Sequence, residues 1–236
     1  KGMFMKFKTD AYLVYAKRTP IGKLNGVLAT VRVDDMLAHL ITDLKSTIKF
    51  DPALIDDVII GCANQAGEDN RNIARMSLIL AGLPMSVPGT TMNRLCGSSL
   101  DALIDAFSRI QAQIADCLVV GGAESMTRAP YVLSKAEHEF DRTQKIYDST
   151  FGWRFVNPLM QKMFPLLGMG ETAEEVADLY KISREEQDLF ALSSHKKALA
   201  AIERGNFKEQ LLPFSIVSKK ETNVIDSDEC IRETTT

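Results

Sequence analysis

The chain lacks the features that mark several large classes of protein. Its 236 residues carry a formal net charge of −3, so a nucleic-acid partner would have no electrostatic support. No apolar run reaches the ~18 residues that a membrane helix needs, and we recognise no signal-peptide pattern. We therefore expect a protein that binds neither nucleic acid nor membrane, folded as one large domain or two small ones.

Cysteine and histidine are also scarce, at four and three residues. The cysteines form no C-x-x-C pair, and no cysteine or histidine cluster has zinc spacing, so we expect no metal. Cys62, Cys96, Cys117 and Cys230 are typical of free thiols in a reducing compartment, which predicts a cytoplasmic location. None of the histidines is an evident base for a nucleophile: His39 and His195 fall within expected helices and His138 within a charged loop.

Hydrophobic periodicity in the first half predicts alternating strands and helices. The expected strands are 12–15, 58–61, 90–95 and 117–122, and the expected helices are 33–49, 72–80 and 97–115. This alternation favours an α/β layer with a parallel or mixed sheet.

Two of these helices carry specific expectations. Asp34 or Asp35 is expected to cap the first of them. The helix at 97–115 is expected to turn one apolar face inward, made of Leu100, Leu103, Ile104, Phe107, Ile110 and Ile114.

The composition changes after Gly122, which predicts a first domain over 1–123 and an inserted one over 124–236. Residues 124–170 are irregular and rich in aromatics and methionine. Helices near 171–180 and 184–204 and a strand at 211–217 follow. The aromatic stretch is interpreted mainly as the core of its own subdomain, and in smaller part as the lining of a tunnel for an acyl chain or pantetheine arm.

Cys96 has an unusual setting, because it follows a polar strand-like run and precedes Gly97, Ser98 and Ser99. A thiol at a helix N-terminus meets the positive end of the helix dipole, which favours the nucleophilic thiolate. The small residues would let the backbone turn sharply and leave room for a substrate carbonyl. A small buried hydrophobe is an equally good interpretation on spacing alone. For Cys62 and Cys117, in apolar strands, packing is the favoured interpretation.

Several blocks resemble one known family. They are RTPIGKLNG (18–26), GEDNRNIARM (67–76), NRLCGSSLDA (93–102), GGAESMTRAPYV (121–132), MGETAEEVA (169–177), SREEQDLFALSSH (183–195) and DSDECIRETTT (226–236). The chain closely resembles the thiolases, which are acyl-CoA acetyltransferases. KIYDSTFGWRFVNPLM (145–160) is most similar to degradative thiolases of the 3-oxoadipyl-CoA type. A ketoacyl synthase of the same fold fits these blocks less well.

The resemblance implies a site and a reaction. Cys96 matches the acyl-accepting cysteine, and its backbone N–H would contribute to an oxyanion site. Met169 matches a residue lining the pantetheine pocket, although Gly168 stands where family members often carry histidine. Arg232 matches a basic residue near the CoA nucleotide. The implied co-substrate is CoA, with no permanently bound cofactor.

The implied fold has αβαβα layers built from two similar halves, and the implied assembly is a homodimer or homotetramer. This chain corresponds to the first half plus most of the inserted loop domain. The second half of the family carries an Asn-Glu-Ala-Phe block, a histidine that activates the nucleophile, and a second cysteine, none of which occurs here. Two hypotheses follow: an acyltransferase that works with a second half, or an incomplete thiolase that only dimerises or binds CoA.

Overall fold

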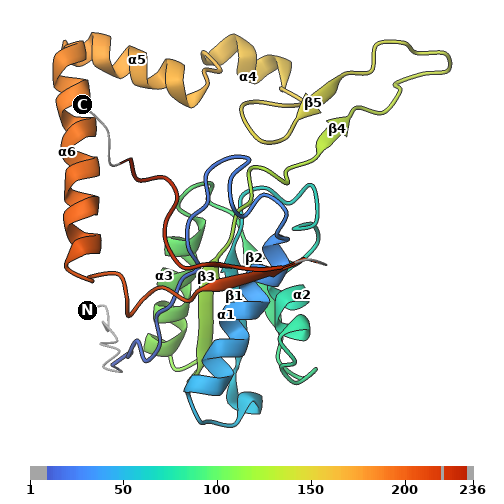
Figure 1. Ribbon diagram of the computed structural model, residues 1–236. Coiled ribbons are helices and arrows are strands. Elements are labelled where there is room, and N and C mark those ends of the chain that lie inside the picture. The colour runs from blue at the N-terminus through green and yellow to red at the C-terminus, as the bar shows by residue number, and fades with distance from the viewer. Residues whose placement is uncertain (1–9, 219–220, 233–236) are drawn as a thin grey trace, which may run out of the picture.

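A three-stranded parallel sheet forms the centre of the computed structural model, which describes residues 10–218 and 221–232 (Figure 1). The strand order is β2-β1-β3, with β1 at Asp57–Gly61, β2 at Gly89–Met92 and β3 at Leu118–Gly122. All five residues of β1 are buried, as expected for a parallel strand covered on both faces. The predicted α/β layer with a parallel sheet is confirmed.

Helices cover both faces of this sheet and give three layers. Helices α1 (Val33–Thr47) and α2 (Ile73–Leu80) pack on one face, where the larger buried cluster includes Val58 and Ile60 of β1. Helix α3 (Ser98–Gln111) packs on the other face, against Ile59 of β1. A short 3-10 turn, Pro52–Leu54, leads from α1 into β1.

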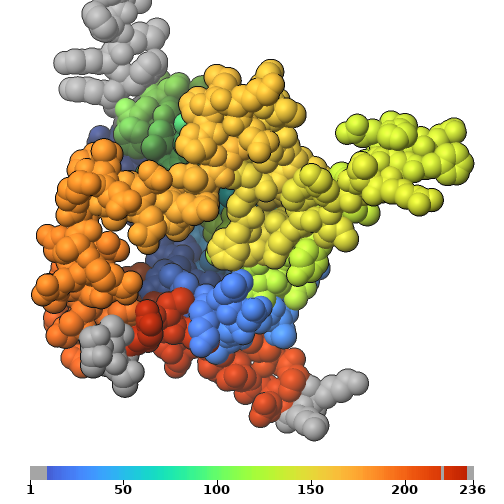
Figure 2. Space-filling model, turned by 90° about the horizontal axis from the view of Figure 1, so that it is seen from above, coloured from blue at the N-terminus to red at the C-terminus, as the bar shows by residue number. Residues whose placement is uncertain are grey.

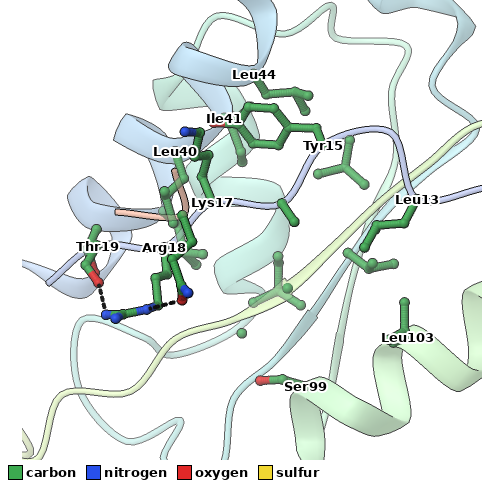
Figure 3. A pocket seen from close by; sticks show the side chains of 18 residues that line it. Leu13, Tyr15, Lys17, Arg18, Thr19, Leu40, Ile41, Leu44, Ser99 and Leu103 are labelled. Carbon is green, nitrogen blue, oxygen red and sulfur yellow. Dashed lines mark hydrogen bonds between the residues drawn. The ribbon is translucent and has the colours of Figure 1, made fainter. Parts of the chain in front are cut away.

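The expected strand at 12–15 is not formed. Tyr12, Leu13 and Val14 lie extended and exposed, and no strand of the described residues pairs with the outer edge of β3. A cavity of about 450 Å³ lies between this segment and β3. In Figure 3, Tyr15 and Arg18 border the cavity on one side, and Leu103 of α3 borders it on the other. The open edge of β3 faces this segment across the cavity, and the two backbones exchange no ladder hydrogen bonds, so the predicted strand is wrong.

The apolar face of α3 is not turned inward as expected. Its sheet-facing side is made of Ala102 and Ala106, with Ile59 of β1 opposite. The larger apolar side chains are exposed: Leu100, Leu103, Ile104, Phe107 and Ile114. The helix ends at Gln111 rather than 115, because Gln113 takes a left-handed conformation (φ 56°).

The start of α1 also differs from the expectation. The helix begins at Val33 with Arg32 as its N-cap, and no side chain caps it in the usual way. Instead Glu68 Oε1 accepts the Val33 N–H at 3.1 Å, and Asp34 is buried in an ion pair with Arg32. The expected cap by Asp34 or Asp35 is therefore wrong.

The second half of the chain forms thin, projecting elements. A hairpin of β4 (Tyr131–Leu133) and β5 (Ile146–Asp148) stands clear of the molecule (Figure 2). Helices α4 (Pro158–Met163), α5 (Met169–Tyr180) and α6 (Arg184–Glu203) follow, and none has a buried residue. Most of the aromatic and methionine side chains of this stretch are exposed. Interpreting it as the core of a subdomain is therefore wrong for this chain.

The chain then returns to the first layer through the hairpin β6 (Phe214–Val217) and β7 (Thr222–Ile225). His39 Nε2 lies 2.9 Å from the Pro213 carbonyl oxygen, and its ring meets Phe214 edge to face. Asp228, just beyond β7, accepts two hydrogen bonds from Arg18 at 2.7 and 2.8 Å. The domain boundary after residue 123 stays a prediction.

Candidate active site

Cys96 lies in a tight turn between β2 and α3. The strand ends at Met92, earlier than the predicted 95, and the helix begins at Ser98. The cysteine is exposed and lines a cavity of about 490 Å³ at the carboxyl ends of β1 and β3. In parallel α/β sheets, ligands bind outside this edge of the strands. The expectation that Cys96 joins a strand to a helix is thus confirmed.

The backbone around Cys96 leaves one N–H without an acceptor. The Gly97 N–H donates to the Arg94 carbonyl at 3.2 Å, and the Ser98 N–H donates to the Leu95 carbonyl at 3.0 Å. The Cys96 N–H makes no hydrogen bond within residues 10–218 and 221–232. An unpaired N–H beside a thiol at a helix N-terminus is the arrangement that can stabilise an oxyanion formed on attack by that thiol.

Glycines at two strand ends bring α3 close to the sheet here. A Cβ on Gly61 would lie 2.3 Å from the Ser98 carbonyl carbon, and one on Gly122 would lie 1.7 Å from Ser99 Oγ. Only glycine permits this approach, so the strand ends place the helix N-terminus directly over the cavity.

The sharp turn itself does not depend on Gly97, contrary to expectation. Gly97 has φ −86°, which any residue adopts, and a Cβ there would meet only the Arg94 carbonyl oxygen, at 3.5 Å. The strained residue is Leu95, whose φ is 51°. The chain reverses through a left-handed leucine held by its neighbours.

Polar residues on the opposite wall were missed by the sequence reasoning. Glu124 accepts the N–H groups of Ala63 and Asn64 at 2.8 and 3.0 Å, and Asn64 Nδ2 donates to the Ser149 carbonyl at 3.1 Å. These contacts join the ends of β1 and β3 to the segment after β5. Glu124 sits in the GGAES block, so that block was the signal that could have revealed it.

Three potential metal-ligating atoms lie behind this wall. Cys62, Asp69 and Glu124 each offer one within 4.8 Å of the others. Burial, with the nearby carboxylates, raises the pKa of Cys62 to about 12, and burial raises that of Asp69. The Cys62 thiol donates to the Asn64 carbonyl at 3.1 Å. Cys62 and Asp69 are buried and Glu124 is exposed, and their hydrogen bonds go to backbone groups of this chain. The packing role inferred for Cys62 from its apolar strand agrees with its burial.

The remaining cysteines and the histidines lie elsewhere. Cys117 is half-buried against the larger core cluster, and burial raises its pKa, while Cys230 is exposed. No histidine lines the Cys96 cavity within the described part of the chain. This agrees with the failure to find a base for Cys96 in the sequence.

The two residues expected to bind CoA stand apart from that cavity. Met169 is the first residue of α5 and is exposed. The Arg232 N–H donates to His195 Nδ1 of α6 at 3.2 Å. Neither residue lines the Cys96 cavity, so their assignments stay predictions.

The fold and site define an α/β protein that presents a thiol at a helix N-terminus over the carboxyl edge of a parallel sheet. Residues 11–236 match the family model described as the N-terminal domain of thiolase. The chain therefore belongs to the thiolase family.

Individual relatives agree with this family. The chain is 50% identical over 231 residues to a beta-ketoadipyl-CoA thiolase of Pseudomonas knackmussii. It is 51% identical over 229 residues to the 3-oxoadipyl-CoA/3-oxo-5,6-dehydrosuberyl-CoA thiolase of Escherichia coli. Each match covers 96% of this chain but 57% of the relative, so the chain spans little more than half their length. The crystal structure of the Bacillus anthracis acetyl-CoA acetyltransferase superposes with a TM-score of 0.82 at 34% identity, covering 94% of this chain and 55% of that one.

None of the helices in residues 10–218 and 221–232 combines the length and apolar character needed to cross a bilayer.

Proposed function

We propose that this chain is the nucleophile-bearing half of an acyl-CoA acyltransferase that cleaves 3-oxoacyl-CoA with CoA, or runs the reverse condensation. The observation that carries the proposal is Cys96, exposed in its cavity beside its own unpaired N–H at the start of α3. Cysteine suits such a reaction because it is both a good nucleophile and a good leaving group.

In this proposal Cys96 Sγ attacks the 3-keto carbon of the substrate, and the Cys96 N–H stabilises the oxygen that becomes negative. The bond between C2 and C3 then breaks. Its electrons stay on C2, which takes up a proton, and acetyl-CoA leaves. The shortened acyl group remains on sulfur as a thioester. The thiol of a second CoA attacks this thioester, releasing the shortened acyl-CoA and returning Cys96 to its starting form. The proton-transfer groups belong to the second half that the resemblance implies.

We further propose a 3-oxoadipyl-CoA-type substrate, since two relatives that are 50% and 51% identical to this chain over the aligned residues carry such names. CoA is the co-substrate, with Met169 near its pantetheine arm and Arg232 near its nucleotide. We expect no resident cofactor, a homodimer or homotetramer, and a cytoplasmic location. We expect a role in the degradation of fatty acids or aromatic compounds, and the names of these relatives favour aromatic degradation.

The second candidate function is a thiolase part that pairs or binds CoA without turnover. The exposed apolar face of α3 favours it for the chain taken alone, because such a face needs a partner to cover it. The two candidates differ only in whether a second half acts with this one.

Removal of the Cys96 thiol in a protein that also carries the second half tests the first proposal. Cys96→Ala is expected to abolish thiolysis, with Cys230→Ala as the control because Cys230 is exposed and outside the cavity. The measurement is CoA-dependent release of acetyl-CoA. Turnover retained by Cys96→Ala would refute the cysteine assignment.

Alkylation tests the same assignment in this chain. Iodoacetamide is expected to label Cys96 fastest, then Cys230, then Cys117, with Cys62 slowest because its pKa is about 12 and it is buried. Peptide mass spectrometry gives the four rates. Equal rates at Cys96 and Cys230 would mean that exposure alone, and not the start of α3, sets the reactivity of Cys96.

A further inference from the structure

The turn that carries Cys96 contains a costly backbone conformation directly before the nucleophile. Leu95 has φ 51°, in the left-handed region that residues with a Cβ avoid. Its side chain is 71% exposed, so little burial of its own offsets this cost. Strain of this kind persists only where surrounding groups over-determine it.

Two side chains hold Leu95 in this conformation. Ser98 Oγ accepts the Arg94 N–H at 2.8 Å and donates to the Leu95 carbonyl at 2.5 Å. Asn93 Oδ1 accepts the Leu95 N–H at 2.8 Å. Asn93 is itself anchored, since its Nδ2 donates to the Ala63 carbonyl just after β1, at 3.0 Å. The peptide groups on both sides of Leu95 are therefore bound by side chains tied to the sheet and to α3.

We propose that Ser98 and Asn93 are positioning residues, which fix the left-handed turn at Leu95 and thereby aim the Sγ and N–H of Cys96 into the cavity. The inference rests on the proposed function of Cys96. The Leu95 carbonyl and the Cys96 N–H belong to one peptide group, so the hydrogen bonds that Ser98 donates to that carbonyl, from Oγ and from its backbone N–H, together set the direction of the Cys96 N–H. If Leu95 relaxed to a right-handed or extended conformation, this peptide group would rotate and the N–H would leave the cavity.

A merely structural role for Ser98 is the alternative, since Ser98 is 3% exposed and buried serines are commonly hydrogen-bonded. Ser77 provides a matched comparison, because it is fully buried in α2 and its Oγ has no hydrogen-bond partner among the described residues. Removing the Ser77 hydroxyl changes a buried serine without touching the turn.

The experiment measures the alkylation rate of Cys96 relative to Cys230 in the same chain, so that Cys230 is an internal standard. Ser98→Ala and Asn93→Ala are expected to lower this ratio about tenfold, toward one, because a displaced thiol loses the environment of the helix start. Asn93→Asp keeps an acceptor for the Leu95 N–H but loses the donor to the Ala63 carbonyl and adds a negative charge near the thiol, so its ratio is expected to fall between those of the parent and Asn93→Ala. Ser77→Ala is expected to leave the ratio unchanged.

Two further measurements separate the outcomes. Hydrogen exchange at the Leu95 N–H, which needs no reactivity, is expected to accelerate about tenfold or more in Asn93→Ala and Ser98→Ala but not in Asn93→Asp. Leu95→Gly combined with Ser98→Ala is expected to recover part of the ratio, since glycine adopts the left-handed conformation without cost. An alkylation ratio of Cys96 to Cys230 near one in the parent would refute the proposal that Cys96 is an activated nucleophile. Hydrogen exchange at the Leu95 N–H would still show whether Asn93 and Ser98 hold the turn. Unchanged exchange and an unchanged ratio in folded Ser98→Ala and Asn93→Ala would overturn the positioning role.

Discussion

Two regions of the molecule carry apolar side chains but bury them differently. The first region is the sheet with its three helices, and the second is the extension from 131 to 203. Every residue of β1 is buried, whereas α4, α5 and α6 have no buried residue at all. The first region encloses its own core between two helical layers. The second presents its apolar side chains to solvent. An apolar sequence pattern therefore indicates a surface that will be covered. It does not indicate which part of the chain, or which partner, covers that surface.

A leucine-to-alanine substitution made once in each region tests this comparison and has the largest expected effect on the free energy of unfolding. Leu78→Ala in α2, where the side chain is 0% exposed, is expected to lower the free energy of unfolding by about 2–5 kcal/mol. Leu189→Ala in α6, where the side chain is 57% exposed, is expected to change it by about 0.5 kcal/mol or less. Urea unfolding followed by circular dichroism measures both. Similar costs would show that α6 contributes a core of its own.

Glycine-to-alanine substitutions compare the stability of the two regions a second time. Gly61→Ala is expected to destabilise by about 1–3 kcal/mol, because its Cβ would fall within 2.4 Å of backbone atoms at the start of α3. A Cβ on Gly170 in α5 would meet no heavy atom of the described residues within 4 Å. Gly170→Ala is therefore expected to raise the free energy of unfolding by up to about 1 kcal/mol, because alanine has the higher helix propensity. Thermal melts of the two variants against the parent measure this. If Gly61→Ala and the parent have the same melting temperature, α3 does not lie as close to the sheet as described.

Much of the first region could be predicted from the sequence. Helices near 33–47 and 73–80 and the strands around 58–61 and 118–122 follow from local periodicity, and the NRLCGSS block identified Cys96. The features that could not be predicted depend on specific contacts between side chains and backbone groups. The left-handed Leu95 donates its N–H to Asn93 and accepts a hydrogen bond from Ser98, and no residue propensity encodes these contacts.

The same limit explains the errors. The apolar periodicity of α3 identifies a helix correctly, but it does not say which side meets the sheet. Gly61 and Gly122 permit a close approach at the start of α3, and further along the helix the small side chains of Ala102 and Ala106 pack against Ile59. The strand expected at 12–15 is absent because a cavity separates this segment from the open edge of β3, a distance that local sequence does not encode.

Arg18, near the start of the described chain, contacts Asp228, just beyond β7 and outside the extension. Arg18→Ala is expected to cost about 2 kcal/mol, between the ~1 kcal/mol of an exposed ion pair and the ~3 kcal/mol of a hydrogen bond to a charged group. Arg18→Lys keeps the charge but loses the two-pronged contact, so an intermediate loss is expected. Urea unfolding at pH 7 provides the comparison. Equal stability of the alanine variant and the parent would contradict a structural role for this pair.

The same contact predicts a pH dependence. The hydrogen bonds from Arg18 hold the pKa of Asp228 below its ordinary value of 3.8. Because the folded-state pKa is lowered, the stabilisation is present above about pH 4 and is lost as the pH falls through the lowered pKa. The stability difference between parent and Arg18→Ala should therefore shrink on acidification below pH 4. A difference that stays constant to pH 2 would remove Asp228 as its source.

A small effect on the stability of this chain is expected for the outer face of α3. Phe107 is 53% exposed there, so Phe107→Ser should change the stability of this chain by about 0.5–1 kcal/mol at most. It should nevertheless reduce binding of an apolar dye, because Phe107 lies in a patch with Leu100, Leu103 and Ile104. Phe140→Ser on the projecting hairpin, 93% exposed, is the matched control and should reduce dye binding less.

The same pair of variants then shows whether a second half covers α3. In a protein that carries the second half, we expect Phe107→Ser to cost about 3–5 kcal/mol, the range for removing a buried phenylalanine, while Phe140→Ser stays near its cost in this chain. A free energy of unfolding that changes equally little in both contexts would mean that the second half packs elsewhere. The apolar face of α3 would then need another partner, such as a second copy of the chain.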